Sequence, residues 1–219
     1  GADLGAGRVL AVLAGERQPA HLQLAVDFPG SVERVADGVD AVRKAAREEL
    51  RRGAFQVKIM ASGGVASPTD PIWNLQYSQD EMRAIVEEAH GWRTYALAHA
   101  YTPEAIARAV RAGVRSIEHG NLIDAETATL MAREGAFLVP TLVTYFKIEE
   151  LGRALGFPAV SQRKVKDVLD AGLASLEIAK AAGVAIGFGT DLLGETPEHE
   201  NQEFAIRARV LPAAEILRS

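Results

Sequence analysis

A lysine inside a short apolar run is the feature that most restricts how this chain can fold. The run Gln56–Met60 reads as a buried strand, and Ala61–Gly64 follows it as a Ser-Gly-Gly turn. A permanent ammonium between Val57 and Ile59 is unfavourable in an apolar interior unless it is paired or chemically changed. Lys58 therefore needs a partner or a modification, and the rest of the sequence has to supply it.

Three later apolar runs each end in a residue that can bind a metal. They are Tyr95–His99, Ser116–Gly120 and Ile186–Asp191, and each of them follows a helical pattern. The chain thus reads as repeated strand-then-helix units, and in an α/β barrel built from such units the active site lies at the carboxyl ends of the strands. The side chains that we expect to meet there are Lys58, His99, His119 and Asp191.

The number of strands falls short of a closed barrel. We count six strands in alternation with helices, from residues 8–14 to residues 184–191, whereas a barrel of this class needs eight strands and typically about 250 residues. The apolar stretch 137–143 is one of the six, is interrupted by Pro140 and donates no ligand. An open sheet of six strands would leave two unpaired edges. We therefore expect a single, partial (β/α)8 barrel domain over residues 1–219, with the missing units on the N-terminal side.

Composition excludes several classes of function. The net charge is −5 and there is no long basic run, so the chain lacks the electrostatic signature of a nucleic-acid-binding protein. No apolar segment approaches the roughly 20 residues of a membrane span. The chain contains no cysteine, so a bound metal would need nitrogen and oxygen ligands. We expect a soluble cytoplasmic protein, with secretion or a periplasmic location left open.

Four motifs in a fixed order point to one family. Val57–Pro71 (VKIMASGGVASPTDP), Ala98–Tyr101 (AHAY), Ile117–Gly120 (IEHG) and Gly187–Asp191 (GFGTD) all stand at expected strand ends. Together they resemble the amidohydrolase superfamily. Within it, the chain is similar to the branch of Xaa-Pro and Xaa-Arg/Lys dipeptidases and carboxypeptidases, which also includes ochratoxin-type amidases and relatives of imidazolonepropionase. The resemblance covers roughly residues 35–219.

The resemblance implies a binuclear metal centre, usually of zinc, at the mouth of a TIM barrel. Lys58 would be carboxylated to a carbamate that bridges the two metals, which converts the buried cation into an anion. His99 and His119 would bind the second metal. Asp191 would bind the first metal and accept a proton from the bridging water, whose pKa the metals lower toward about 7.

The resemblance also implies the reaction and the contacts to substrate. A metal-bound hydroxide would attack the amide carbonyl of a small molecule, either a dipeptide such as Xaa-Pro or Xaa-Arg/Lys or an N-acyl amino acid. Tyr101 would hydrogen-bond the substrate carbonyl or the tetrahedral intermediate, and Ser62 and Gly63 would contact the substrate. A homo-oligomer is the expected assembly, with no nucleic-acid or membrane partner.

The chain departs from the family at one point. The family places a His-x-His pair on the first barrel strand as ligands of the first metal, and this sequence contains no His-x-His. The second-metal set of Lys58, His99 and His119 is complete, whereas the first-metal site has only Asp191. We expect the N-terminal strands to be missing from this sequence. The alternatives are a second chain that completes the barrel and a decayed fragment.

Other functions stay open at this point. A lactonase or a phosphotriesterase-like hydrolase of the same fold would share the metal chemistry, and a catalytically incomplete fragment could act as a scaffold or oligomer partner. A serine nucleophile at Ser62 is not supported, because no Gly-x-Ser-x-Gly elbow surrounds it.

Overall fold

The computed structural model describes residues 7–11, 33–192 and 196–219. The loop predicted over residues 15–31, with His21, lies outside the described residues, as does the end of the strand predicted over 8–14. The strands are β1 (Gly7–Ala11), β2 (Glu33–Ala36), β3 (Val57–Met60), β4 (Ala96–Ala100), β5 (Ser116–His119), β6 (Phe137–Val139) and β7 (Ala185–Ile186). The helices are α1 (Val39–Arg51), α2 (Gln79–Gly91), α3 (Pro103–Arg111), α4 (Ala125–Glu134), α5 (Leu142–Leu151), α6 (Ala159–Ala181), α7 (Gln202–Arg207) and α8 (Ala213–Ile216), with a 3-10 turn η1 (Pro197–His199).

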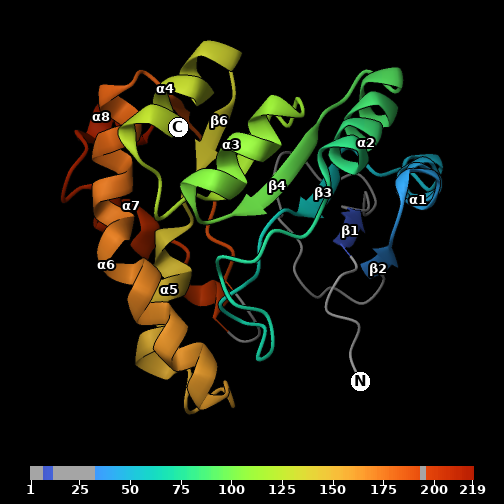
Figure 1. Ribbon diagram of the computed structural model, residues 1–219. Coiled ribbons are helices and arrows are strands. Elements are labelled where there is room, and N and C mark those ends of the chain that lie inside the picture. The colour runs from blue at the N-terminus through green and yellow to red at the C-terminus, as the bar shows by residue number, and fades with distance from the viewer. Residues whose placement is uncertain (1–6, 12–32, 193–195) are drawn as a thin grey trace.

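The described strands form one sheet in the order β2-β1-β3-β4-β5-β6-β7. The five strands from β3 to β7 are parallel neighbours in chain order, and helices alternate with them (Figure 1). This arrangement confirms the predicted α/β class. Within the described residues the sheet is not closed into a barrel, and β2 and β7 are its edges.

The first predicted unit of the barrel was wrong. β1 pairs antiparallel with both β2 and β3, so it is not the strand of a parallel β/α unit. The prediction also missed β2. Its sequence, Glu-Arg-Val-Ala, has no apolar alternation, and its pairing with β1 joins segments that are far apart in the sequence.

The strand predicted over residues 137–143 was also wrong in its second half. β6 ends at Val139, and α5 begins at Leu142. Pro140 has no N–H for a strand ladder, and a buried apolar run cannot be assigned to strand or helix by its pattern alone. Of the strand predicted over 184–191, only Ala185–Ile186 is regular.

The two faces of the parallel strands differ in character. One face packs against the helices through buried apolar side chains: Val57, Ile59, Ala98, Ile117 and Leu138. The opposite face carries Lys58, His99 and Glu118, because successive side chains of a strand point to opposite sides. The register places His99 beside Met60 on one neighbouring strand and beside Glu118 on the other. The sheet thus has an apolar outer face and a polar inner face.

The helices that follow β3, β4 and β5 begin with the expected caps. Ser78 and Glu81 form the predicted capping box of α2. Thr102 caps α3, which starts with Pro103, and Asp124 caps α4. These caps satisfy N–H groups at the helix starts, and they keep the turn after β4 to two residues, which fixes where His99 lies.

Among the described helices, none combines the length and the apolar character that crossing a membrane requires.

We predict that truncating Ile117 destabilises the protein strongly. Its side chain is fully buried in the contact between sheet and helices, and Ile-to-Ala changes at such sites cost about 2 to 5 kcal/mol. Denaturant unfolding of Ile117→Ala measures this loss. The matched control is Leu217→Ala, whose side chain is 76% exposed and should stay within about 0.5 kcal/mol. Equal stability of the two variants would contradict the packing described.

Candidate metal centre

The predicted site residues lie at the carboxyl ends of neighbouring strands. Lys58 is on β3, His99 is on β4 and His119 is the last residue of β5. Asp191 follows β7 by five residues. The side chains of Lys58, His99 and His119 are buried, and that of Asp191 is 15% exposed. The parallel strands bring these four residues from distant parts of the sequence to the end of the sheet at which the strands have their carboxyl ends.

His99 is a neutral imidazole whose tautomer is set by the backbone. Burial lowers the pKa of His99 to about 3, and the charge of Lys58 acts in the same direction. Its Nε2 lies 3.0 Å from the carbonyl oxygen of Gly63. A carbonyl can only accept, so Nε2 carries the proton, and Nδ1 holds the free lone pair that a metal requires.

His119 is also neutral, and its Nδ1 faces a hydroxyl. Burial lowers the pKa of His119 well below its usual value, with further lowering by His99 and Lys58. Its Nδ1 lies 2.7 Å from the Thr141 hydroxyl. That hydroxyl also hydrogen-bonds Tyr145, and because a hydroxyl can both donate and accept, it can accept from Nδ1 while it donates to the phenol. In that arrangement the free lone pair is on Nε2, which lies 3.9 Å from Asp191 Oδ2.

The rings of the two histidines pack together with those of two tyrosines. The ring centroids of His99 and His119 are 4.6 Å apart, and Tyr101 lies 4.7 Å from His99 and 5.4 Å from His119. Tyr145 donates a hydrogen bond to the Tyr101 hydroxyl over 3.0 Å. Burial is the main cause that raises the pKa of Tyr101, so this phenol keeps its proton. The rings thus have fixed directions relative to one another.

Two carboxyl groups have an oxygen without a partner. Asp191 Oδ1 and Glu118 Oε2 are buried and have no hydrogen-bond partner among the described residues. Burial raises the pKa of Asp191, and Lys58 partly offsets this. Burial likewise raises the pKa of Glu118 to about 7, with Lys58 and a hydrogen bond from Ser116 acting against it. Such unpartnered buried oxygens are unfavourable unless another group binds them.

Three residues with uncommon backbone conformations lie at the same place. His119, Thr141 and Asp191 have φ values of 76°, 47° and 46°. Residues other than glycine rarely adopt this left-handed region, and they persist there only where the surrounding structure holds them. Three of the residues that meet at this edge of the sheet are therefore held in uncommon conformations.

The turn after β3 packs tightly against the site. Ser62 is fully buried and its hydroxyl donates to the Gly63 carbonyl over 3.1 Å. A Cβ atom on Gly63 would lie 1.9 Å from the Pro71 carbonyl oxygen, so only glycine fits there. Both residues have structural contacts, and a contact of either with substrate stays a prediction.

Lys164 of α6 holds the Ser62–Pro71 loop through three backbone carbonyls. Its Nζ donates to Gly64 O over 3.1 Å, to Ser67 O over 2.7 Å and to Asp70 O over 2.6 Å. Burial lowers the pKa of Lys164, and Asp70 opposes this. The loop that carries the acceptor for His99 is thus fastened to a helix about 100 residues later in the sequence.

Sequence reasoning missed Thr141, Tyr145 and Lys164. Residues 137–143 were interpreted as a strand without a ligand, although a threonine directly before an apolar run, as Thr141 is, is a common start of a helix and could have suggested one. Lys164 lies in a helix with many charged residues, and no local pattern separates it from exposed lysines. Glu118, whose carboxylate accepts a hydrogen bond from Ser116, was not singled out either.

The described residues supply some of the donor atoms that a metal would need. In the described part of the chain, histidine, aspartate and glutamate do not by themselves form a group of three or more that could hold one. A site would therefore need Lys58 as well. The free lone pairs on His99 Nδ1 and His119 Nε2 and the unpartnered Asp191 Oδ1 are nitrogen and oxygen donors of the kind that zinc binds.

The chain matches the model of one protein family over nearly its whole length. That family is described as the amidohydrolase family, and residues 8–218 match it. The chain belongs to the amidohydrolase family.

Relatives within the amidohydrolases share its sequence and fold. The chain is 36% identical to ochratoxinase of Aspergillus niger over 172 residues, which are 78% of this chain and 36% of that protein. It is 56% identical to a prolidase crystallised with N-methylphosphonate-L-proline, with a TM-score of 0.85 over 90% of this chain and 50% of that one. A Xaa-Pro dipeptidase with bound methionine gives 32% identity and a TM-score of 0.74 over 82% of this chain and 45% of that one. The chain thus spans half or less of these relatives.

We predict that Lys164→Met loosens the Ser62–Pro71 loop. Hydrogen bonds from a charged donor contribute more than neutral ones, and losing this set should cost about 1 to 3 kcal/mol locally. The Gly63 amide, which donates to Asn74 O over 3.0 Å, should then exchange its hydrogen about 10- to 100-fold faster. Lys166→Met, at an exposed position of the same helix, is the control. Unchanged exchange at Gly63 in the Lys164 variant would rule out this role.

Proposed function

We propose that this chain supplies the second-metal half of a binuclear zinc centre in an enzyme that hydrolyses an amide bond. The observation that carries the proposal is the pair of buried, neutral imidazoles, whose rings contact the Gly63 carbonyl through His99 Nε2 and the Thr141 hydroxyl through His119 Nδ1. With the protons on these two nitrogens, His99 Nδ1 and His119 Nε2 would be free, beside a buried lysine and an unpartnered aspartate oxygen. A purely structural cluster would have no need for free lone pairs in a buried place.

The residues that would hold the metals follow from this set. Lys58, as a carbamate, would bridge the two ions, His99 and His119 would bind one of them, and Asp191 would bind the other. The ions would supply Lewis acidity and a lowered pKa for water. The two remaining ligands are the His-x-His pair absent from this sequence, and we propose that a further segment or a second chain contributes them.

The chain's own groups have defined tasks in the hydrolysis. Asp191 accepts a proton from the attacking water, since its Oδ1 has no other partner in the described structure. Tyr101 keeps its proton because burial raises its pKa. Its oxygen already accepts from Tyr145, so its own O–H is available to donate to the carbonyl oxygen as negative charge develops there. His99 and His119 stay neutral and fixed in direction.

The proposed substrates are dipeptides with a C-terminal proline, arginine or lysine, and N-acyl amino acids. The names of similar proteins support this class, because they include a prolidase, a Xaa-Pro dipeptidase and an ochratoxinase. A panel of such amides, tested beside lactones and phosphotriesters, distinguishes this proposal from the other hydrolase classes.

We predict that zinc content depends on Lys58. Lys58→Met removes the amine that would form the carbamate, so the purified protein should lose most of its zinc, as measured by atomic emission. Lys44→Met is the control, because the Lys44 side chain is 77% exposed and is not one of the proposed metal ligands. Incubation with labelled bicarbonate should also give a carbamate signal by carbon NMR in the unaltered protein. Full zinc in the Lys58 variant, or no carbamate signal, would refute the bridging role.

We also predict that Asp191→Asn lowers kcat for a Xaa-Pro dipeptide by about 100-fold or more, because a general base contributes roughly 10²- to 10⁴-fold. The assay uses the protein with its full natural sequence. Lactone or phosphotriester hydrolysis without amide hydrolysis would replace the proposed substrate class. A chain without zinc and without hydrolase activity would support the scaffold alternative.

A further inference from the structure

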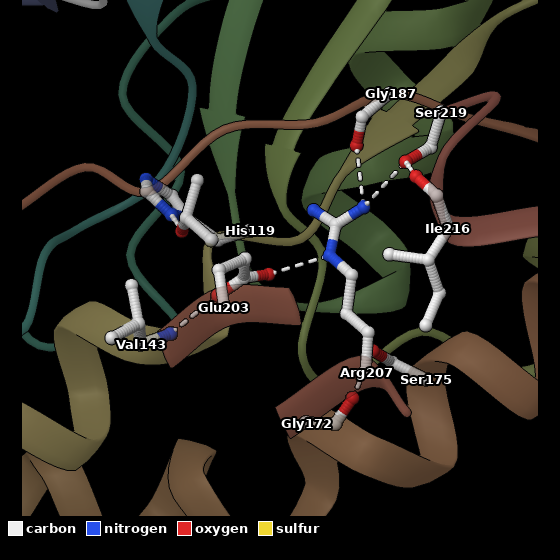
Figure 2. A network of polar contacts seen from close by, with 10 residues as sticks. His119, Val143, Gly172, Ser175, Gly187, Glu203, Arg207, Ile216 and Ser219 are labelled. Carbon is white, nitrogen blue, oxygen red and sulfur yellow. Dashed lines mark hydrogen bonds and ion pairs between the residues drawn. The ribbon is translucent and has the colours of Figure 1, made fainter. Parts of the chain in front are cut away.

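Two oppositely charged side chains of α7 are completely buried. Glu203 and Arg207 have 0% of their side-chain surface exposed, and Arg207 Nε donates to Glu203 Oε1 over 2.7 Å. Their spacing of four residues puts them on one face of the helix. A buried ion pair is unfavourable unless its remaining polar atoms find partners. The partners of this pair, drawn in Figure 2, therefore indicate what it does.

Glu203 caps a helix other than its own. Its Oε2 accepts a hydrogen bond from the Val143 N–H over 2.7 Å, in the first turn of α5. That turn contains no acidic residue, and its N-cap residue, Thr141, makes no capping hydrogen bond. First-turn N–H groups lack partners and carry a partial positive charge, which a carboxylate stabilises. Glu203 thus supplies the capping hydrogen bond that Thr141, the N-cap residue of α5, does not make.

The consequence is that the Thr141 hydroxyl does not cap α5. A threonine at an N-cap normally turns its hydroxyl to accept from the N–H groups of its own helix. Here Thr141 has φ 47°, and its hydroxyl lies 2.7 Å from His119 Nδ1 instead. The cap from Glu203 and the contact from Thr141 to His119 are therefore two parts of one arrangement.

Arg207 extends the arrangement to the other side of the site. Its Nη1 donates to Gly187 O over 3.1 Å, and its guanidinium lies 4.9 Å from the centroid of the Phe188 ring. Both residues lie between β7 and Asp191. Figure 2 shows the guanidinium between Glu203 and Gly187. The pair thus contacts the first turn of α5 at Val143 and the segment that leads to Asp191.

We propose that Glu203 is a positioning residue for His119. By capping α5 it leaves the Thr141 hydroxyl to hold His119 Nδ1, so that His119 Nε2 stays directed toward Asp191, while Arg207 holds the same carboxylate and the segment before Asp191. The catalytic consequence rests on the proposed function, whereas the effect on the His119 tautomer is a property of this chain alone.

The test compares Glu203→Gln with Glu200→Gln by nitrogen NMR of the histidine rings. A carboxamide has one acceptor oxygen, so the Glu203 variant cannot serve both the Val143 N–H and Arg207. We expect its His119 signals to move from a single tautomer, protonated on Nδ1, to a mixture. We also expect kcat for the dipeptide to fall about 10- to 100-fold with little change in KM. Glu200 is exposed, and its variant should match the unaltered protein. An unchanged His119 tautomer in Glu203→Gln would overturn the proposal.

A double-mutant cycle separates positioning from general destabilisation. Thr141→Val removes the hydroxyl that holds His119, and Thr141→Ser retains it. If Glu203 acts through Thr141, Glu203→Gln should change kcat by less than about 2-fold in the Thr141→Val background, because the two changes interrupt the same chain of contacts. Thr141→Ser should keep the full effect of Glu203→Gln. If Glu203→Gln instead lowers kcat by the same factor with valine as with serine at position 141, the two residues act independently and the proposal is overturned.

A second variant covers failure to fold. Glu203→Leu combined with Arg207→Met replaces the buried pair by apolar groups, which is often neutral or stabilising. We expect this variant to fold and still to lose the single His119 tautomer. A folded variant with the tautomer retained would overturn the proposal. The NMR result does not need zinc or activity, so it decides the role of Glu203 even if the proposed hydrolysis is not found.

Discussion

Burial of charge-bearing groups on the inner face of the sheet is the constraint on which the rest of the site depends. Lys58, His99, His119 and Glu118 lie on strands whose other face is an ordinary apolar contact with helices. In such a place the neutral forms of the histidines and of the carboxyl groups are favoured, and every remaining polar atom needs a partner. Burial lowers the pKa values of His99 and His119, so both rings are neutral. Burial raises the pKa values of Glu118 and Asp191. The lone pairs and oxygens left over are the atoms that a metal would bind.

The surrounding structure fixes which atoms are left over. A backbone carbonyl selects the tautomer of His99, and a side-chain hydroxyl contacts Nδ1 of His119. Each selector is itself held from elsewhere: Gly63 belongs to the loop that Lys164 binds, and Thr141 precedes the helix that Glu203 caps. Outer contacts of this kind orient the ligands of metal sites and raise their basicity. The α6 and α7 helices thus contribute to the site without supplying a ligand.

The sequence predicted the parts of this arrangement that depend on local patterns. The α/β class, the parallel strands from β3 to β7 and the caps of α2, α3 and α4 follow from periodicity and from residues such as Ser78 and Pro103. The positions of His99 and His119 follow from the motifs at strand ends. β2 could not be predicted, because its four residues are stabilised by pairing with a distant strand. Thr141 and Glu203 could not be found either, since their roles appear only when residues about 20 and 60 positions apart are brought together.

The fastening of the Ser62–Pro71 loop to α6 has a consequence for how this family can diversify. The ammonium of Lys164 replaces, for three carbonyl groups of the loop, the water or the strand partner that they would otherwise need. A loop of different length or shape would place its carbonyl groups elsewhere, and the Lys164 ammonium would lose these hydrogen-bond acceptors. Transplanting the loop between relatives should therefore succeed only when the facing turn of α6 travels with it, so the two segments are expected to be exchanged as one module.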